Sequence, residues 1–411
     1  MYVIFAKGVA QMMKNTYAQV IVAGGGPAGA MAAIAAARGG ADTLLIERSG
    51  CVGGIWTSGL LSWMLDVTNK GGILKEMTSR IEKAGEGYFA REGNFITFPE
   101  SVKLTLEEML QEAGVRVLYY TQVTGCEMKD GRITAIITHS KAGRVVFTAD
   151  QFVDATGDGD LSSFAGCTFE QGKPETGEMQ PASLIALMAG VKADEVREYN
   201  NTLPYIEGST AKKRMLEKMH EAGVDPSYQS PSFFHIKDDI WILMTTHAYG
   251  VDPYDPETLT RATMENRAEL KRQEIAMRAL GGPWSNMRVI ATAPYVGVRE
   301  GRRVKGKYTV TIEDALEGKK HDDAVCTVMF PLDVHPLAKD HIPGREHKGY
   351  RTKPFDIPLR SLISADVDNL LLAGRLISGD FLSHSSYRVS GDAAAIGEAA
   401  GAEAARRIQK M

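Results

Sequence analysis

The sequence predicts an α/β protein in which a domain built on a parallel sheet is interrupted by a second, α+β domain. A strand, a glycine-rich turn, a helix and another strand follow one another at residues 19–48. Two later strands also run into glycine turns, at residues 151–160 and 368–375, and an Ala/Gly-rich helix follows the last one. The stretch between them, from about residue 166 to residue 340, is richer in Met and aromatic runs. Strands that alternate with helices in this way favour a parallel sheet.

The first unit begins with an apolar run at residues 20–23, which predicts a buried strand. An Ala-rich stretch at residues 30–38 predicts the helix, and a second apolar run at residues 43–46 predicts the next strand. That strand ends at Glu47, close to the spacing of about 20 residues at which an acid meets the hydroxyls of a ribose. The order of these elements is that of a Rossmann-type dinucleotide site.

The turn carries glycines at the spacing G-x-G-x-x-G, namely Gly24, Gly26 and Gly29. Gly24 lets the chain turn sharply out of the strand, and Gly29 lets the helix pack close to it. Gly26 has no Cβ, so a pyrophosphate can approach the backbone there. With Pro27 and Ala28, these residues begin a helix whose free N–H groups and dipole attract phosphates.

The length of 411 residues suits two or three domains. We expect an N-terminal extension at residues 1–18 and the first part of the nucleotide domain at residues 19–165. A substrate or cap domain is expected at residues 166–340, and the nucleotide domain closes at residues 341–411.

The composition limits the class of function. Hydrophobic residues make up 44% of the chain and charged residues 24%, and the formal net charge is −4. No general basic field therefore favours nucleic acid or an anionic membrane surface. No run reaches the roughly 18 apolar residues that a membrane span needs, so we expect no membrane association.

The cysteines and histidines give no sign of a metal site. The four cysteines are scattered without C-x-x-C pairing, which argues against zinc and a disulfide framework and fits a reducing, cytoplasmic compartment. Three histidines share one loop without carboxylate or cysteine partners at ligand spacing. These residues are Cys51, Cys126, Cys167, Cys326, His335, His341 and His347.

After Glu47 the chain continues through a second glycine-rich stretch, R-S-G-C-V-G-G-I-W-T-S-G, at residues 48–59. With the preceding unit, this stretch resembles the FAD-dependent oxidoreductases built on the glutathione-reductase-type FAD-binding fold. The resemblance implies that it runs along the pyrophosphate and ribityl chain of the flavin, through Arg48, Gly53, Gly54, Thr57 and Ser58.

The following region is expected to be mostly helical at residues 60–98 and helical at residues 102–113, with a strand at residues 115–119. Residues 121–123 then continue into two β-rich runs, at residues 133–138 and 144–148, around the turn at residues 129–132. In the resembled three-layer fold, such a β-meander replaces a helical crossover, and the position of Val123 touches the adenine through its backbone.

A second anchor is the run D-A-T-G-D-G-D at residues 154–160. A calcium loop is the alternative interpretation, but its twelfth position is Ala165 instead of Glu. The resemblance implies that the run passes next to the dinucleotide, through Ala155, Thr156, Gly157 and Asp158.

The inserted domain should contain a strand at residues 240–246 and a helix at residues 256–280. It also carries the run V-R-E-G-R-R at residues 298–303, which resembles a segment of the family. Arg299 or Arg302 would orient a substrate carboxylate or stabilise negative charge on reduced flavin. The alternative is a solvated face or an internal ion-pair network.

The closing part carries a strand, then A-G-R, an acid and a final helix. In the family pattern Gly374, Arg375, Asp380 and Gly391 hold the flavin, and the N-terminus of the helix stabilises an anionic reduced ring. The polar residues just before that helix could supply a general base or an oxyanion donor, and their alternative role is capping and packing. These residues are His384, Tyr387 and Arg388.

These patterns predict an FAD-dependent oxidoreductase that binds FAD non-covalently and transfers a hydride between flavin and a small-molecule substrate. No second G-x-G-x-x-G follows an apolar strand, so electrons would come from the substrate, a freely bound nicotinamide or a protein carrier. The oligomeric state is left open. Two alternatives remain: a non-catalytic flavin- or dinucleotide-binding protein, and a thiazole-synthase-like enzyme that uses NAD on the same fold.

Overall fold

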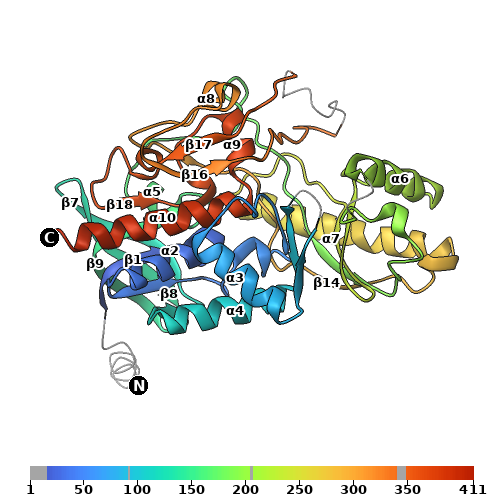
Figure 1. The fold of residues 1–411 in the computed structure, drawn as a ribbon, viewed down its shortest axis with the longest axis horizontal. Helices are drawn as coiled ribbons and strands as arrows, with labels where there is room; N and C mark the ends of the chain where they lie inside the picture. Colours follow the sequence, from blue (N-terminus) through green and yellow to red (C-terminus); the bar gives the residue numbers. More distant parts are fainter. Residues whose placement is uncertain (1–15, 91–92, 204–206, 340–348) are drawn as a thin grey trace.

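The computed structural model describes residues 16–90, 93–203, 207–339 and 349–411, and Figure 1 shows their arrangement. The expected extension at residues 1–18 lies mostly outside the described residues, and Tyr17 already belongs to the first strand.

A seven-stranded sheet forms the main layer of the molecule. Strands β6, β2, β1, β9 and β18 run parallel, and β8 and β7 continue the sheet from β9 in antiparallel fashion. The strands are β1 (Tyr17–Ala23), β2 (Thr43–Ile46), β6 (Arg116–Leu118), β7 (Gln122–Lys129), β8 (Arg132–Ser140), β9 (Gly143–Asp154) and β18 (Leu370–Leu372). This is the Rossmann-like sheet that the sequence predicts.

Strand β9 joins two runs that the sequence presents as separate strands. Its first half pairs with β8, where Thr148 lies opposite Ala135, and its second half pairs with β18, where Phe152 lies opposite Leu370. The β-meander therefore takes the place of a helical crossover. Because β1, β9 and β18 are parallel, their carboxyl ends meet at one edge of the sheet, which is where a ligand binds in such folds.

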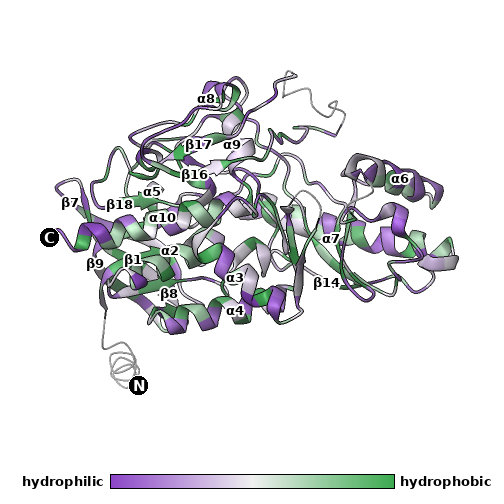
Figure 2. Ribbon diagram, in the orientation of Figure 1, coloured by the Kyte–Doolittle hydropathy of each residue, from purple (hydrophilic) through white to green (hydrophobic). Residues whose placement is uncertain are grey.

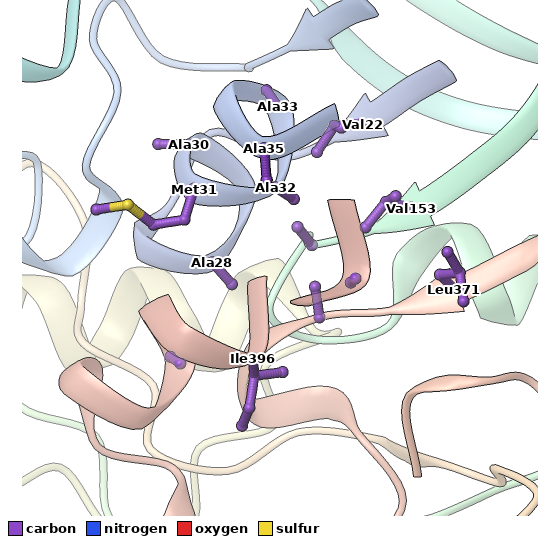
Figure 3. Packing of buried hydrophobic residues seen from close by; sticks show 14 of the residues in the cluster. Val22, Ala28, Ala30, Met31, Ala32, Ala33, Ala35, Val153, Leu371 and Ile396 are labelled. Carbon is purple, nitrogen blue, oxygen red and sulfur yellow. The ribbon is translucent and has the colours of Figure 1, made fainter. Parts of the chain in front are cut away.

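Helices α2 (Pro27–Arg38) and α10 (Ser390–Ile408) pack together over this sheet. A Cβ on Gly397 would lie 2.0 Å from the carbonyl oxygen of Ala28, so the two backbones approach each other closely only because that residue is glycine. Figure 3 shows α2 facing Ile396 of α10 at this contact. Figure 2 shows hydrophobic residues gathered on α2, with hydrophilic residues along α7 at the periphery.

The expectation of a mostly helical segment at residues 60–98 is wrong at both ends. Helix α3 (Gly72–Lys83) forms, but it is flanked by a small antiparallel sheet of β3 (Trp63–Met64), β5 (Phe95–Thr97) and β4 (Gly87–Phe89). Strands β3 and β5 pair across about 30 residues, a contact that a local periodicity cannot reveal. Helix α4 (Pro99–Glu112) follows, as expected.

A second antiparallel sheet with its own core lies beside the first domain. Its strand order is β12, β13, β11, β14, and Trp241 is fully buried at its centre. The strands of this sheet and the helices between them are β11 (Ala186–Ala189), α6 (Gly208–Glu221), β12 (Ser232–Lys237), β13 (Ile240–Met244), α7 (Pro256–Ala279) and β14 (Arg288–Thr292). The expected strand and long helix of the inserted domain therefore form.

Shorter elements complete the chain, and several of them pack into the core of the first domain. They are α5 (Asp160–Phe164), β10 (Phe169–Glu170), β15 (Arg303–Val304), α8 (Ile312–Glu317), β16 (Ala324–Val328), β17 (Phe355–Pro358) and α9 (Phe381–Tyr387). Val304, Val310 and Val328 already belong to the core of the first domain. We therefore propose that the chain leaves the inserted domain near Arg303, before the boundary at residue 340 that we expected.

Candidate active site

A cavity of about 440 Å³ lies where the edge of the main sheet meets the second sheet. A volume of this size suits a ligand site. Residues from both domains line it. Of the residues singled out from the sequence, the lining includes Gly24, Gly26, Pro27, Ala28, Glu47, Arg48, Gly54, Ser58, Ala155, Thr156, Gly157, Asp158, Arg299, Gly374, Arg375 and Arg388.

The three glycines of the first motif have different surroundings. Gly24 has a φ of +96°, and a Cβ there would lie 2.5 Å from the carbonyl oxygen of Ala155. A Cβ on Gly29 would lie 1.8 Å from the carbonyl oxygen of Gly24, so this glycine lets helix and strand touch. A Cβ on Gly26 would meet nothing within 4 Å. Gly26 therefore borders open space in the cavity, as a pyrophosphate site requires.

Glu47 holds the backbone of the glycine-rich turn beside this site. Its Oε2 accepts a hydrogen bond from the Gly25 N–H at 2.6 Å, and its Oε1 accepts one from the Ser49 N–H at 2.7 Å. A carboxylate has about four lone-pair positions, so each oxygen keeps capacity for a ribose hydroxyl. The carboxylate thus both ties the turn to β2 and presents acceptors to a ligand.

The turn after β9 is held by an ion pair. Arg375 donates to Asp158 at 2.6 Å, across the face of Gly157, whose φ is +87°. A Cβ on Gly157 would lie 2.6 Å from Nη1 of Arg375. The glycine therefore lets the segments after β9 and β18 approach each other at the cavity wall.

The N-terminal turn of α10 faces the same cavity. Val389, Ser390 and Ala393 line it, and no side chain in the described part of the chain caps this helix end. Asp392 points elsewhere, to Lys70 at 2.9 Å. Apart from the Gly391 N–H, which is bonded within the protein, the N–H groups of the first turn and the dipole of a 19-residue helix are therefore available to negative charge in the cavity.

Other residues predicted for the cofactor lie outside the lining, and their role toward a ligand stays a prediction. The Gly53 N–H donates to the Gly25 carbonyl at 2.8 Å, and the Thr57 hydroxyl donates to the Val52 carbonyl at 2.6 Å. Both hydrogen bonds hold together the chain segments that form the cavity wall, although Gly53 and Thr57 do not line the cavity. Gly29 supports this wall in the same way.

Three further residues predicted for the cofactor make contacts with other residues of the protein. Val123 lies in β7 opposite Thr138. Asp380 caps α9 by accepting from the Ser383 N–H at 2.7 Å. The Gly391 N–H donates to the Leu65 carbonyl at 3.0 Å, where a Cβ would clash.

His384, which we predicted as a catalytic residue, is fully buried and does not line the cavity. It lies in α9 with its ring edge-on to Tyr387, 5.5 Å between centroids. Burial and the nearby arginines hold its pKa well below the usual value. The side chain is therefore packed behind the cavity wall instead of facing a ligand.

Arg299 does face the cavity. Its Nη1 donates to the Pro181 carbonyl at 2.6 Å and to the Ser183 hydroxyl at 2.9 Å, while Nη2 meets only the Met244 sulfur at 4.0 Å. It forms no ion pair within 4 Å among the described residues. Burial and the charge of Arg388 lower its pKa to about 10, so it stays protonated at neutral pH.

Beside Arg299 lies an acid–imidazole pair that sequence reasoning missed. Asp333 lies 3.2 Å from Nε2 of His335 and accepts from Arg388 at 3.1 Å. Burial raises the pKa of Asp333, but its interactions with His335, Arg388 and Arg299 outweigh this effect and keep that pKa well below the usual value. Burial and Arg299 lower the pKa of His335 to about 4. The pair therefore holds an ionised acid and a neutral imidazole at pH 7.

Asp333 and His335 are only two positions apart, but nothing in the sequence shows that Asp333 meets Arg388, 55 positions later in the chain, at the cavity. We call Ser183, Arg299, Asp333, His335 and Arg388 the polar end of the cavity; all of them line it. Tyr228 also lines it and lies 5.6 Å from the His335 ring, and His247 stacks on Tyr228 at 4.0 Å.

Fold and cavity together are those of a dinucleotide-binding α/β protein in which residues of a second sheet complete the cavity wall. Residues 19–411 match the family described as FAD dependent oxidoreductase, and the chain belongs to that family. FAD is therefore its cofactor. Among the described residues, no group of three His, Cys, Asp or Glu side chains could hold a metal ion, and no helix has the length and apolar character needed to cross a bilayer.

Two solved structures share the fold at low sequence identity. A geranylgeranyl bacteriochlorophyll reductase-like protein of Thermoplasma acidophilum has a TM-score of 0.51 and 14% identity, covering 96% of this chain and 78% of that one. The flavin-dependent brominase Bmp2 has a TM-score of 0.51 and 13% identity, covering 96% and 80%. These similarities concern the fold alone.

Among curated proteins, the thiamine thiazole synthase of Pyrococcus abyssi is 27% identical over 158 residues. The match covers 36% of this chain and 60% of that protein, so the chain spans less than two thirds of this relative. The synthase of Methanococcus aeolicus is 26% identical over 188 residues, or 43% and 68%. Such partial similarity does not favour the thiazole-synthase alternative over the family that matches nearly the whole chain.

Proposed function

We propose that the protein transfers a hydride between non-covalently bound FAD and a small-molecule substrate held at the polar end of the cavity. One observation carries this proposal: a single cavity is lined both by the dinucleotide motifs and by Arg299, Asp333 and His335. A non-catalytic flavin protein would not need a charged chamber joined to its cofactor site.

The residues present suit FAD. Gly26 leaves room for a pyrophosphate, Glu47 offers acceptors to a ribose, and the first turn of α10 offers donors to the electron-rich edge of a ring. When bound, the flavin supplies a ring position that accepts or releases a hydride. The chain itself supplies position, charge and proton handling.

We propose His335, instead of His384, as the group that handles the proton. His335 lines the cavity and is neutral at pH 7, so it can accept a proton. If Nε2–H points at Asp333, the basic nitrogen is Nδ1, and the carboxylate stabilises the imidazolium that forms. Arg388 holds Asp333 in place through both the side-chain and main-chain oxygens.

The pH dependence of flavin reduction tests this assignment. The pKa of about 4 predicts a rate that is constant above pH 5 and falls as His335 becomes protonated at lower pH. His335→Gln should slow reduction by about 100-fold, within the usual range for general acid–base catalysis, while FAD stays bound. His384→Gln, behind the wall, is the matched control. A rate in His335→Gln equal to that of the parent would refute the assignment.

Anaerobic titration tests the function itself. The purified protein should be yellow, and its flavin absorbance should bleach when a substrate, a free nicotinamide or a protein carrier delivers electrons. A flavin that only stabilises the fold would stay oxidised with every donor. Copurified nicotinamide or an ADP adduct without yellow colour would favour the thiazole-synthase alternative. The cytoplasmic location remains a proposal based on the cysteine pattern.

A further inference from the structure

We infer that the polar end of the cavity binds an organic monocarboxylate with an apolar body, and that Arg299 pairs with its carboxylate. This inference deepens the proposed function by naming the class of substrate. It rests on the N–H donors of Arg299 that the protein does not use, on the charge balance of the chamber and on the apolar side chains that also line the cavity.

The protein anchors the guanidinium of Arg299 through Nη1, and the other N–H donors of the group keep capacity for a ligand. A guanidinium has five N–H donors, and the protein engages both donors of Nη1, through Pro181 and Ser183. Nη2 has only a weak sulfur acceptor at 4.0 Å. The edge formed by Nε and Nη2 is therefore free for the bidentate pairing that arginine makes with a carboxylate.

The charges that face Arg299 do not cancel. Asp333 is paired with Arg388 at 3.1 Å, and His335 is neutral, so one positive charge remains at Arg299. A half-buried charge without a partner is unfavourable, and a single negative charge on a ligand would compensate it. A phosphate monoester would bring nearly two charges at pH 7. Lys212 also lines the cavity, but it is partly exposed on α6 and water can hydrate it.

Part of the chamber wall is apolar. Trp63 and Phe234 pack edge to face, 3.7 Å between centroids, and both line the cavity. Ile185 and Met244 extend this wall on the second sheet. A ligand that reaches Arg299 would therefore lie beside aromatic and aliphatic side chains, which favours an alkyl or aryl body over a sugar.

Ligand pairs that differ only in charge test the inference on the FAD-loaded protein. We would measure benzoate against benzamide, and phenylacetate against phenylacetamide, by calorimetry and by the change in the flavin absorption spectrum. The parent should bind each carboxylate roughly 10- to 100-fold more tightly than its amide, because a hydrogen bond to a charged group is lost in the amide. Arg299→Met should abolish this preference, and Arg288→Met, on the exposed side of the second sheet, should keep it.

Several results would overturn the inference. Equal affinity for acid and amide in a yellow, dithionite-reducible parent would reject the carboxylate while the flavoprotein function stands. Tighter binding of phenyl phosphate than of benzoate would reject the monoanion argument. If Arg299→Met shifts the flavin potential but keeps the preference, Arg299 serves the flavin instead.

A colourless parent would reject the proposed function, and calorimetry would still report on Arg299. If Arg299→Met fails to fold, Arg299→Lys and Arg299→Gln take its place, with the charge-preserving lysine expected to keep more of the preference.

Discussion

Gly26→Val should separate the fold from cofactor binding. Gly26 is the N-cap of α2 with φ −68° and ψ −171°, an extended conformation that valine adopts readily. Because a Cβ meets no atom within 4 Å, the apoprotein should keep its stability to within about 1 kcal/mol. The added methyl groups would occupy the space for the pyrophosphate. At a hundredfold excess of ligand over Kd, the parent gains about 2.7 kcal/mol from binding, and the variant should lose this gain.

The assay is urea denaturation with and without added FAD, together with the flavin content of the purified protein. Gly71→Val is the matched control, because Gly71 is also a helix N-cap with open space around it but does not line the cavity. The control should bind stoichiometric FAD. Stoichiometric FAD in Gly26→Val would refute our placement of the pyrophosphate, and an unstable apoprotein would refute the claim that Gly26 is not needed for packing.

Two further substitutions give predictions about stability. Gly29→Ala should destabilise the protein by about 3 kcal/mol or more in urea denaturation, because its Cβ would overlap the Gly24 carbonyl, and unchanged stability would contradict the packing argument. The pKa of Asp160 is raised to about 6 by burial and by Asp158, so its ionised form is disfavoured in the folded state above pH 6. Asp160→Asn should therefore stabilise the protein at pH 8, and the gain should vanish as the pH falls through 6 toward 4. Its side chain is 38% exposed, so the gain should be below about 1 kcal/mol, and an equal gain at pH 8 and pH 4.5 would refute it.

The nucleotide end could be predicted because its roles are local. The functions of Gly24, Gly26 and Gly29 depend on backbone geometry within six residues of chain, and G-x-G-x-x-G encodes that geometry directly. The acid at Glu47 follows from the length of one strand–helix–strand unit. Only the start of α2, at Pro27, differs from the expected helix, because proline suits the first turn.

At the polar end, the sequence predicts Arg299 and Arg388 as candidates, and both line the cavity. It does not predict Asp333 and His335 for the site, because the polar end forms only when distant segments meet. Arg299 reaches Ser183 across 116 positions, and Arg388 reaches Asp333 across 55. His384 is only four positions from Arg388, yet α9 turns the histidine into the core while Arg388 lines the cavity. Positions four apart share one face of a helix, and Arg388 follows α9 as its C-cap, so the sequence pattern does not distinguish the buried histidine from the arginine that reaches the cavity.

If these proposals hold, the two ends of the cavity recognise ligands by different means. At Gly26 the protein offers backbone N–H groups and a helix dipole, which any diphosphate satisfies regardless of what it carries. At Arg299 it offers a side-chain charge, whose position depends on the second domain. Changes at the first end should remove the cofactor whatever the substrate, and changes at the second should alter substrate choice with the cofactor retained. Since the charge is carried by a few side chains outside the nucleotide motifs, substrate specificity can diverge without altering the flavin site.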